Sequence, residues 1–131
     1  TFLYEHNGGT NSSLKASENL NVASGKVYQI GETESLSSGL DYPSVSPLHC
    51  FLKDTGRAEY TSATDEQALN AYKLVSKLEN ISPSLEPSHA FATAISLAPK
   101  LSKDTILCID SCGHSLKDSE IIKEKLGFYT E

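Results

Sequence analysis

Residues 105–115, TILCIDSCGHS, decide the fold class of this 131-residue chain. Thr105 to Ile109 is a continuous apolar run bounded by polar residues, a pattern typical of a strand buried on both faces of a parallel sheet. Small and polar residues follow it from Asp110 to Ser115. Ligands of open α/β sheets bind outside the carboxyl ends of the strands, so this loop is the first candidate for a site. The alternative is a solvated turn without a ligand.

Three helices are predicted around this strand. Residues 64–67, TDEQ, form a capping box, and apolar residues then recur with a period of 3.6. The apolar positions of that helix are Ala68, Ala71, Tyr72, Val75 and Leu78. A second helix begins at Ser88, which can cap it, and ends before Pro99. Its apolar side comprises Phe91, Ala94, Ile95 and Ala98. Asp118 to Leu126 is a closing helix ended by Gly127.

The order helix, helix, strand, loop, helix predicts an α/β architecture. We expect three layers, with a mostly parallel sheet flanked by helices. Ala58 to Ser62 is a second, shorter strand candidate in this part of the chain. Residues 39–131 are assigned to one α/β domain.

The chain before residue 39 differs in composition. Residues 1–38 are predicted to form a short strand, Thr1 to Glu5, followed by a long polar connection. That connection contains one further strand candidate, Lys26 to Ile30. Asp41 to Pro47 contains two prolines and is predicted to be irregular rather than helical.

Composition excludes several classes of function. The chain carries 17 acidic and 11 basic residues, a formal net charge of −6. Nucleic acid is not an expected partner, because its phosphates bind clustered Lys and Arg. No run approaches the roughly 20 apolar residues that cross a bilayer, so no membrane association is predicted. The three cysteines, Cys50, Cys108 and Cys112, lack the spacing of a disulfide framework, which favours a reducing compartment, and we expect the cytoplasm.

Few side chains form a pattern that indicates chemistry by itself. Cys108, Cys112 and His114 are zinc-type donors, but their spacing favours a core position for Cys108 over a metal site. Glu86 precedes the predicted second helix, where a carboxylate faces either the helix amides or a ligand. His89, one turn into that helix, is interpreted as a packed histidine.

Four short segments match a known family in order and spacing. Residues 39–45 read GLDYPSV, residues 56–60 GRAEY, residues 64–69 TDEQAL and residues 83–90 PSLEPSHA. They resemble the tryptophan synthase beta subunit, a pyridoxal-phosphate enzyme of fold type II, which has GLD(F/Y)PSV and PALESSHA at the first and last of them. The resemblance is collinear from about Ile30 to Lys125 and implies the C-terminal portion of that subunit, within its cofactor-binding α/β domain.

The resemblance implies roles for three matched side chains and backbones near the cofactor. Asp41 is the candidate catalytic residue, because its counterpart reaches the substrate amino acid and helps to close the active site. Gly39 would lie against pyridoxal phosphate, and Glu86 would stand near its ring.

A monovalent cation, Na or K, is also implied. Its ligands in the family are backbone carbonyls at the positions of Leu40, Tyr42 and Ser44, and carbonyl oxygens suit such a hard cation.

The loop after the predicted strand is where the chain departs from the family. The family reads SGRGDKD, and residues 112–118 read CGHSLKD. The partner of the cofactor's ring nitrogen then becomes Cys112, followed by Gly113, with Ser111 as the alternative if the register differs by one. A thiol is a weaker hydrogen-bond partner than a hydroxyl. Further departures are Ser46, Leu48, Pro87 and His114.

The function implied by the resemblance is that of a lyase of tryptophan biosynthesis. It condenses L-serine with indole through a pyridoxal-phosphate aminoacrylate, as a homodimer with a partner of the alpha-subunit type. The family's Schiff-base lysine and phosphate loop have no counterpart here, so the 131 residues alone are expected to be inactive. Because the chain starts at Thr1, we expect it to be part of a longer one. Two alternatives stay open, a non-catalytic interaction module with the beta-subunit fold and a related β-replacement enzyme.

Overall fold

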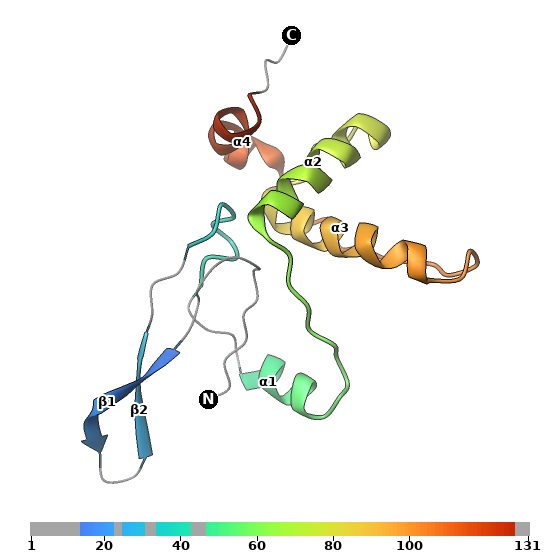
Figure 1. Cartoon of the computed structure of the whole chain (residues 1–131). Coiled ribbons are helices and arrows are strands. Elements are labelled where there is room, and N and C mark those ends of the chain that lie inside the picture. The colour runs from blue at the N-terminus through green and yellow to red at the C-terminus, as the bar shows by residue number, and fades with distance from the viewer. Residues whose placement is uncertain (1–13, 23–24, 31–33, 43–46, 128–131) are drawn as a thin grey trace.

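The computed structural model describes residues 14–22, 25–30, 34–42 and 47–127. The strands are β1 (Leu14–Val22) and β2 (Gly25–Ile30). The helices are α1 (Pro47–Asp54), α2 (Asp65–Glu79), α3 (Leu85–Leu97) and α4 (Ser119–Leu126). Two short 3₁₀ helices, Ala98–Lys100 and Ser115–Asp118, follow α3 and precede α4. In Figure 1, α2, α3 and α4 come together, whereas α1 and the two strands extend away from them.

The two strands form an antiparallel pair. Leu14 lies opposite Ile30 and Val22 opposite Gly25, with an irregularity between Ala16 and Asn21. The predicted strand at residues 26–30 is therefore confirmed, and the polar connection proposed before residue 39 contains a second strand that its sequence does not announce. The strand predicted at residues 1–5 lies outside the described residues.

Helix α1 was not predicted, because the two prolines between Asp41 and Pro47 indicated irregular structure. Pro47 is its first residue, a position where the missing N–H of proline costs nothing because no helical carbonyl would accept it. The helix ends at a turn in which Gly56 has a φ of +67°. His49 Nδ1 lies 2.9 Å from the Tyr60 hydroxyl, and this contact joins α1 to the extended chain before α2.

The capping box of α2 is confirmed. The Gln67 N–H donates to Thr64 Oγ1 over 3.2 Å, and the Thr64 N–H donates to Gln67 Oε1 over 2.8 Å. Two backbone N–H groups at the start of the helix, which have no helical acceptor, thereby gain side-chain acceptors. Four of the five predicted apolar positions are buried, the exception being Leu78, which is 66% exposed.

Helix α3 begins at Leu85 rather than at the predicted Ser88. Ser84 is the residue before the helix, and Pro87 fits inside the first turn because N–H groups there have no helical acceptor. Glu86 consequently belongs to the helix and does not precede it. The Ser88 hydroxyl does not cap the start but donates back to the Ser84 carbonyl over 2.7 Å.

The buried core joins α2, α3, α4 and the 34–42 segment. Its centre comprises Tyr72, Leu85 and Ile122, packed against the partly buried Leu36, Leu69, Ile121 and Leu126. The closing helix is confirmed to within one residue, and Gly127 ends it at a φ of +60°. In the described part of the chain, no helix has both the length and the apolar character needed to cross a membrane.

The predicted parallel sheet is not found among the described residues. Ala58–Ser62 and Thr105–Ile109 are extended segments without strand pairing, and Ile106 is 91% exposed. Cys108 is exposed as well, so its predicted core position is wrong. A strand is stable only when a neighbouring strand accepts and donates its backbone hydrogen bonds, and neither segment has such a neighbour in the described ranges.

The capping box gives a first prediction. Replacing Thr64 by Ala should lower the free energy of unfolding by about 1 kcal/mol, because the Gln67 N–H loses its acceptor. Urea denaturation followed by circular dichroism measures the change. Thr64→Ser, which keeps the hydroxyl, and Ser62→Ala, outside the cap, serve as controls. Equal stability of the Thr64→Ala and Ser62→Ala chains would contradict the assignment.

Candidate functional site

The carboxylate of Glu86 connects three separate segments of the chain. Its Oε1 accepts the N–H of Gly39 over 2.8 Å. Its two oxygens lie 2.9 and 2.8 Å from Nζ of Lys117. The side chain of Glu86 is 16% exposed, although it carries a charge. The motif at residues 39–45 and the motif at residues 83–90 thus meet at one carboxylate, and the 111–118 loop meets them there.

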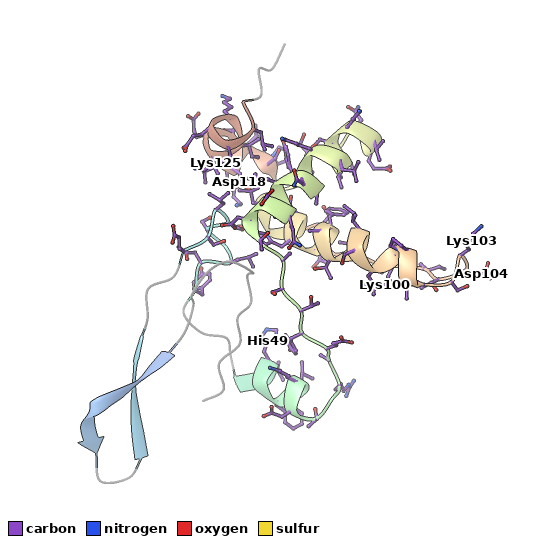
Figure 2. The ribbon with its side chains drawn as sticks, in the orientation of Figure 1. His49, Lys100, Lys103, Asp104, Asp118 and Lys125 are labelled. Atoms are coloured by element: carbon purple, nitrogen blue, oxygen red, sulfur yellow. The ribbon has the colours of Figure 1, made fainter. Side chains whose placement is uncertain are left out.

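Lys117 also pairs with Asp118 from its own loop. The ammonium lies 2.6 Å from Asp118 Oδ1. Asp118 Oδ2 accepts the N–H of Leu85 over 2.9 Å, and Asp118 is 2% exposed. Figure 2 shows Asp118 near the place where α2, α3 and α4 approach one another, whereas Lys100, Lys103 and Asp104 lie beyond the opposite end of α3. The buried aspartate therefore supplies the side-chain cap that Ser84 does not give to α3.

Gly39 is required by the closeness of this contact. A Cβ atom at this position would meet the Glu86 carboxylate, with Oε1, Cγ and Cδ all inside van der Waals distance. Any larger residue would push Glu86 away from the Gly39 N–H. The glycine is explained by this approach and not by its backbone dihedrals.

The pKa of Glu86 is set by opposing effects. Burial alone would raise it, but the hydrogen bonds from Lys117, from its own backbone N–H and from the Gly39 N–H lower it from 4.5 to about 2. Burial likewise favours neutral Lys117, while Asp118 and Glu86 together raise the pKa of the ammonium. Glu86 is consequently ionised at neutral pH and accepts hydrogen bonds rather than donating a proton.

The loop that carries Ser111, Cys112 and Gly113 is held to α3 by its backbone. The Ser84 hydroxyl donates to the Cys112 carbonyl over 3.0 Å. Gly113 has a φ of +75°, and a Cβ atom there would lie 2.8 Å from Ser84 Oγ, so both conformation and space favour glycine. The side chains of Ser111 and Cys112 are exposed. Their hydroxyl and thiol thus project from a loop that is fixed at Ser84 and at Glu86.

Asp41 and the carbonyls near it form the third part of the site. Asp41 is half-buried, and its Oδ1 is shielded from solvent without a hydrogen-bond partner. The Leu40 carbonyl accepts the Tyr42 N–H over 3.0 Å. Ser44 lies outside the described residues, so the cation site predicted from Leu40, Tyr42 and Ser44 stays a prediction.

The histidines have structural contacts. His114 Nδ1 accepts the Leu116 N–H over 3.2 Å at the start of the 3₁₀ helix. His89 is buried, with Nδ1 2.7 Å from the Leu85 carbonyl and Nε2 3.5 Å from Asp65 Oδ1. This agrees with its interpretation as a packed histidine. Across the described residues, no group of three or more His, Cys, Asp or Glu side chains is arranged to hold a metal.

Sequence reasoning did not single out Lys117, Asp118 or Ser84. Asp118 was predicted only as the first residue of the closing helix, and Lys117 and Ser84 appeared only within the motifs that match the family. The available signal was that residues 117 and 118 match the Lys and Asp that end the family's loop, whereas residues 112 and 114–116 differ.

Sequence comparison with known proteins supports the family suggested by the motifs. The tryptophan synthase beta chain of Cereibacter sphaeroides is 51% identical over 100 residues, which are 76% of this chain and 24% of that protein. Those of Rhodopseudomonas palustris and Bordetella petrii are 50% and 48% identical over 99 residues. No protein-family model matches the chain. The chain spans about a quarter of the length of the curated relatives that it matches.

These relatives are pyridoxal-phosphate enzymes of fold type II, and the chain corresponds to a region of such an enzyme. Within that class, it belongs to the tryptophan synthase beta-chain family, whose C-terminal portion it matches. The resemblance drawn from the four motifs is thereby confirmed. The roles of individual residues are not tested by these matches.

The low pKa of Glu86 predicts a pH dependence of stability. The folded chain binds fewer protons than the unfolded chain between pH 4.5 and 2, so the stabilisation is complete above about pH 4.5 and is lost as the pH falls toward 2. Because Lys117 is 42% exposed, we expect about 1–2 kcal/mol rather than the roughly 3 kcal/mol of a fully shielded pair. Glu86→Gln should remove this contribution at pH 7 and flatten the acid slope.

The measurement is urea denaturation at several pH values between 2 and 7. Glu79→Gln is the matched control, because Glu79 is an exposed glutamate at the end of α2. If the Glu86→Gln and Glu79→Gln chains lose stability with the same acid slope, the Glu86 contacts do not stabilise the fold as described.

Proposed function

We propose that this chain supplies one wall of the pyridoxal-phosphate site of a tryptophan synthase beta-type enzyme, which condenses L-serine with indole. The observation that carries the proposal is the meeting of the 39–45, 83–90 and 111–118 segments at Glu86, in a chain about 50% identical to tryptophan synthase beta chains. The remaining three quarters of the relatives' length would supply the rest of the site.

The residues present fit this cofactor. Asp41 Oδ1 is shielded and lacks a hydrogen-bond partner, as expected of a group that receives its donor from a ligand. The missing side chain at Gly39 lets its backbone approach the Glu86 carboxylate, which in the proposal stands near the ring. Ser111 and Cys112 offer a neutral hydroxyl and thiol on a loop anchored by Ser84. A neutral partner suits a ring nitrogen that is not to be protonated.

Each residue has a defined task in the proposal. Pyridoxal phosphate, when bound, withdraws electrons from the substrate's α-carbon. Asp41 accepts a hydrogen bond from the substrate amino acid and orients it. Glu86, ionised by its contact with Lys117, holds the Gly39 backbone in place and presents negative charge near the ring. Ser111 or Cys112 contacts the ring nitrogen.

The rest of the proposed assembly follows from the family. We infer a monovalent cation at the Leu40, Tyr42 and Ser44 carbonyls, a homodimer, a partner of the alpha-subunit type and a cytoplasmic location. We also infer that Ala58–Ser62 and Thr105–Ile109 become strands of a parallel sheet. In support, Tyr60 and Leu107 border the same cavity of about 430 Å³ against one side of α3.

A chimera tests the function. The matching hundred residues of the Cereibacter sphaeroides beta chain are replaced by those of this chain, and tryptophan formation from L-serine and indole is measured with added cofactor. We expect activity, and an about hundredfold lower kcat/KM with Asp41→Asn, because a misplaced substrate loses that order of rate. Asn70→Asp, on the exposed side of α2, is the control variant with unchanged activity.

The outcomes separate the three candidate functions. A folded chimera that uses other nucleophiles but not indole indicates a related β-replacement enzyme. A folded chimera without any turnover contradicts the enzyme and favours the interaction module with the beta-subunit fold.

The 131 residues by themselves should form no tryptophan, because the resemblance places the lysine that bonds to the cofactor outside them. The isolated chain is incubated with pyridoxal phosphate, L-serine and indole, and tryptophan fluorescence is recorded, with the active chimera as positive control. A cofactor absorbance band that disappears when one of the chain's own lysines is substituted would contradict this expectation.

A further inference from the structure

The site contains one cation that touches two carboxylates of different burial. Lys117 Nζ lies 2.8 Å from Glu86 and 2.6 Å from Asp118, and its own side chain is 42% exposed. Asp118 is fixed independently, because its second oxygen accepts the Leu85 N–H and it is almost fully buried. Among the described residues, Glu86 is held besides Lys117 by the Gly39 N–H and the Ser37 side chain, and its side chain is more exposed than that of Asp118.

Because Asp118 is the more firmly held carboxylate, it fixes Lys117, and Lys117 in turn positions Glu86. The buried Asp118 at the start of α3 fixes the ammonium, and the ammonium fixes Glu86 in the first turn of the same helix. The ammonium is a compact charge with three donors, so it can serve both carboxylates at once. Glu86 then fixes Gly39 and with it the segment that carries Asp41.

We propose that Lys117 is a positioning residue, which holds Glu86 ionised and directed at Gly39 and so sets the place of the 37–42 segment against the 111–118 loop. The inference rests on the proposed function for its importance in catalysis. Its physical content, the coupling of Lys117 to Glu86, does not depend on a cofactor.

No other charged group in the described chain takes over this task. Lys117 is the one charged side chain among the groups that shift the pKa of Glu86, and the remaining lowering groups are backbone N–H donors and the Ser37 side chain. Asp65 and His89 form a separate contact further along α3. Asp118 faces Glu86 only through the shared ammonium. Removing the charge at Lys117 therefore removes the largest of the effects that lower the pKa of Glu86, and that pKa should rise.

The experiment follows the Glu86 carboxyl carbon by ¹³C NMR as the pH is lowered, in the full 131-residue chain and in the chimera without cofactor. The wild-type midpoint should lie near 2. In Lys117→Met, which keeps the length of the side chain, it should rise by at least one unit, which is about a tenfold increase in proton affinity. Lys117→Arg should stay close to wild type because the charge is kept.

Lys125→Met is the matched control. Lys125 lies on α4, and within the described ranges its ion pair is with the neighbouring Glu124, so its loss should leave the Glu86 midpoint unchanged. If Lys117→Met prevents folding, the wild-type and Lys117→Arg titrations still decide the matter. A midpoint at or above 4.5 in either folded chain overturns the proposal, as does an equal midpoint in folded Lys117→Met and wild type.

Catalysis provides a second, separable measurement. In an active chimera, Lys117→Met should move the acid limb of kcat/KM to higher pH by about one unit, and Lys117→Arg should restore it. A role in folding alone would change the amount of active protein and not the position of this limb. If the chimera is inactive but Lys117→Met raises the Glu86 midpoint as expected, the proposed function is refuted and the coupling of Lys117 to Glu86 stands. If the chimera is active but Lys117→Met leaves the Glu86 midpoint unchanged, the coupling alone is refuted.

Discussion

The contact between Glu86 and Lys117 is the interaction on which the rest of the site depends. It joins the first turn of α3 to the loop before α4, and the Gly39 N–H attaches the 34–42 segment to the same carboxylate. A partly buried ion pair is weak as a source of net stability, because desolvation offsets much of the attraction. Its value lies in geometry, since three segments remote in sequence must adopt one arrangement for all the donors and acceptors to be matched.

Two residues explain why the arrangement is so compact. Glycine at 39 lets the backbone approach the carboxylate, and Asp118 places a negative charge at the positive end of α3. The Asp118 contact also accounts for the start of α3 at Leu85. A helix can begin at residues without a local side-chain cap when a distant carboxylate accepts the orphan N–H.

The local patterns of the sequence were sufficient for α2 and α4. The capping box at 64–67 and the glycine at 127 act within a few residues, so their geometry follows from the residues themselves. The start of α3 was missed because its cap comes from residue 118, and α1 because a proline was read as a breaker rather than as a first helical residue. The prediction of a strand at 105–109 is not confirmed for a different reason, because strand pairing depends on neighbouring strands that no local pattern specifies.

The same distinction holds for the site. Asp41 and Gly39 were found by likeness to a family, and Glu86 already by its place near the start of the second helix. The structure brings Gly39 and Glu86 into contact. Lys117 was missed because its importance arises from two carboxylates that meet it only after folding. Residues 112 and 114–116 differ from the family, whereas Gly113, Lys117 and Asp118 agree with it. The contacts give a physical reason for the agreement, since Gly113 lies against Ser84 at a positive φ, and Lys117 and Asp118 hold Glu86 and α3.

The exposed run at 105–109 has a consequence for the chain in solution. Five consecutive apolar or β-branched residues without a proline form a segment to which a second copy can pair through its backbone. Lys103 and Asp104 stand directly before this run and Asp110 directly after it. Charges in these flanking places oppose the stacking of identical segments, so they act as guards against aggregation whenever the run lacks a neighbouring strand.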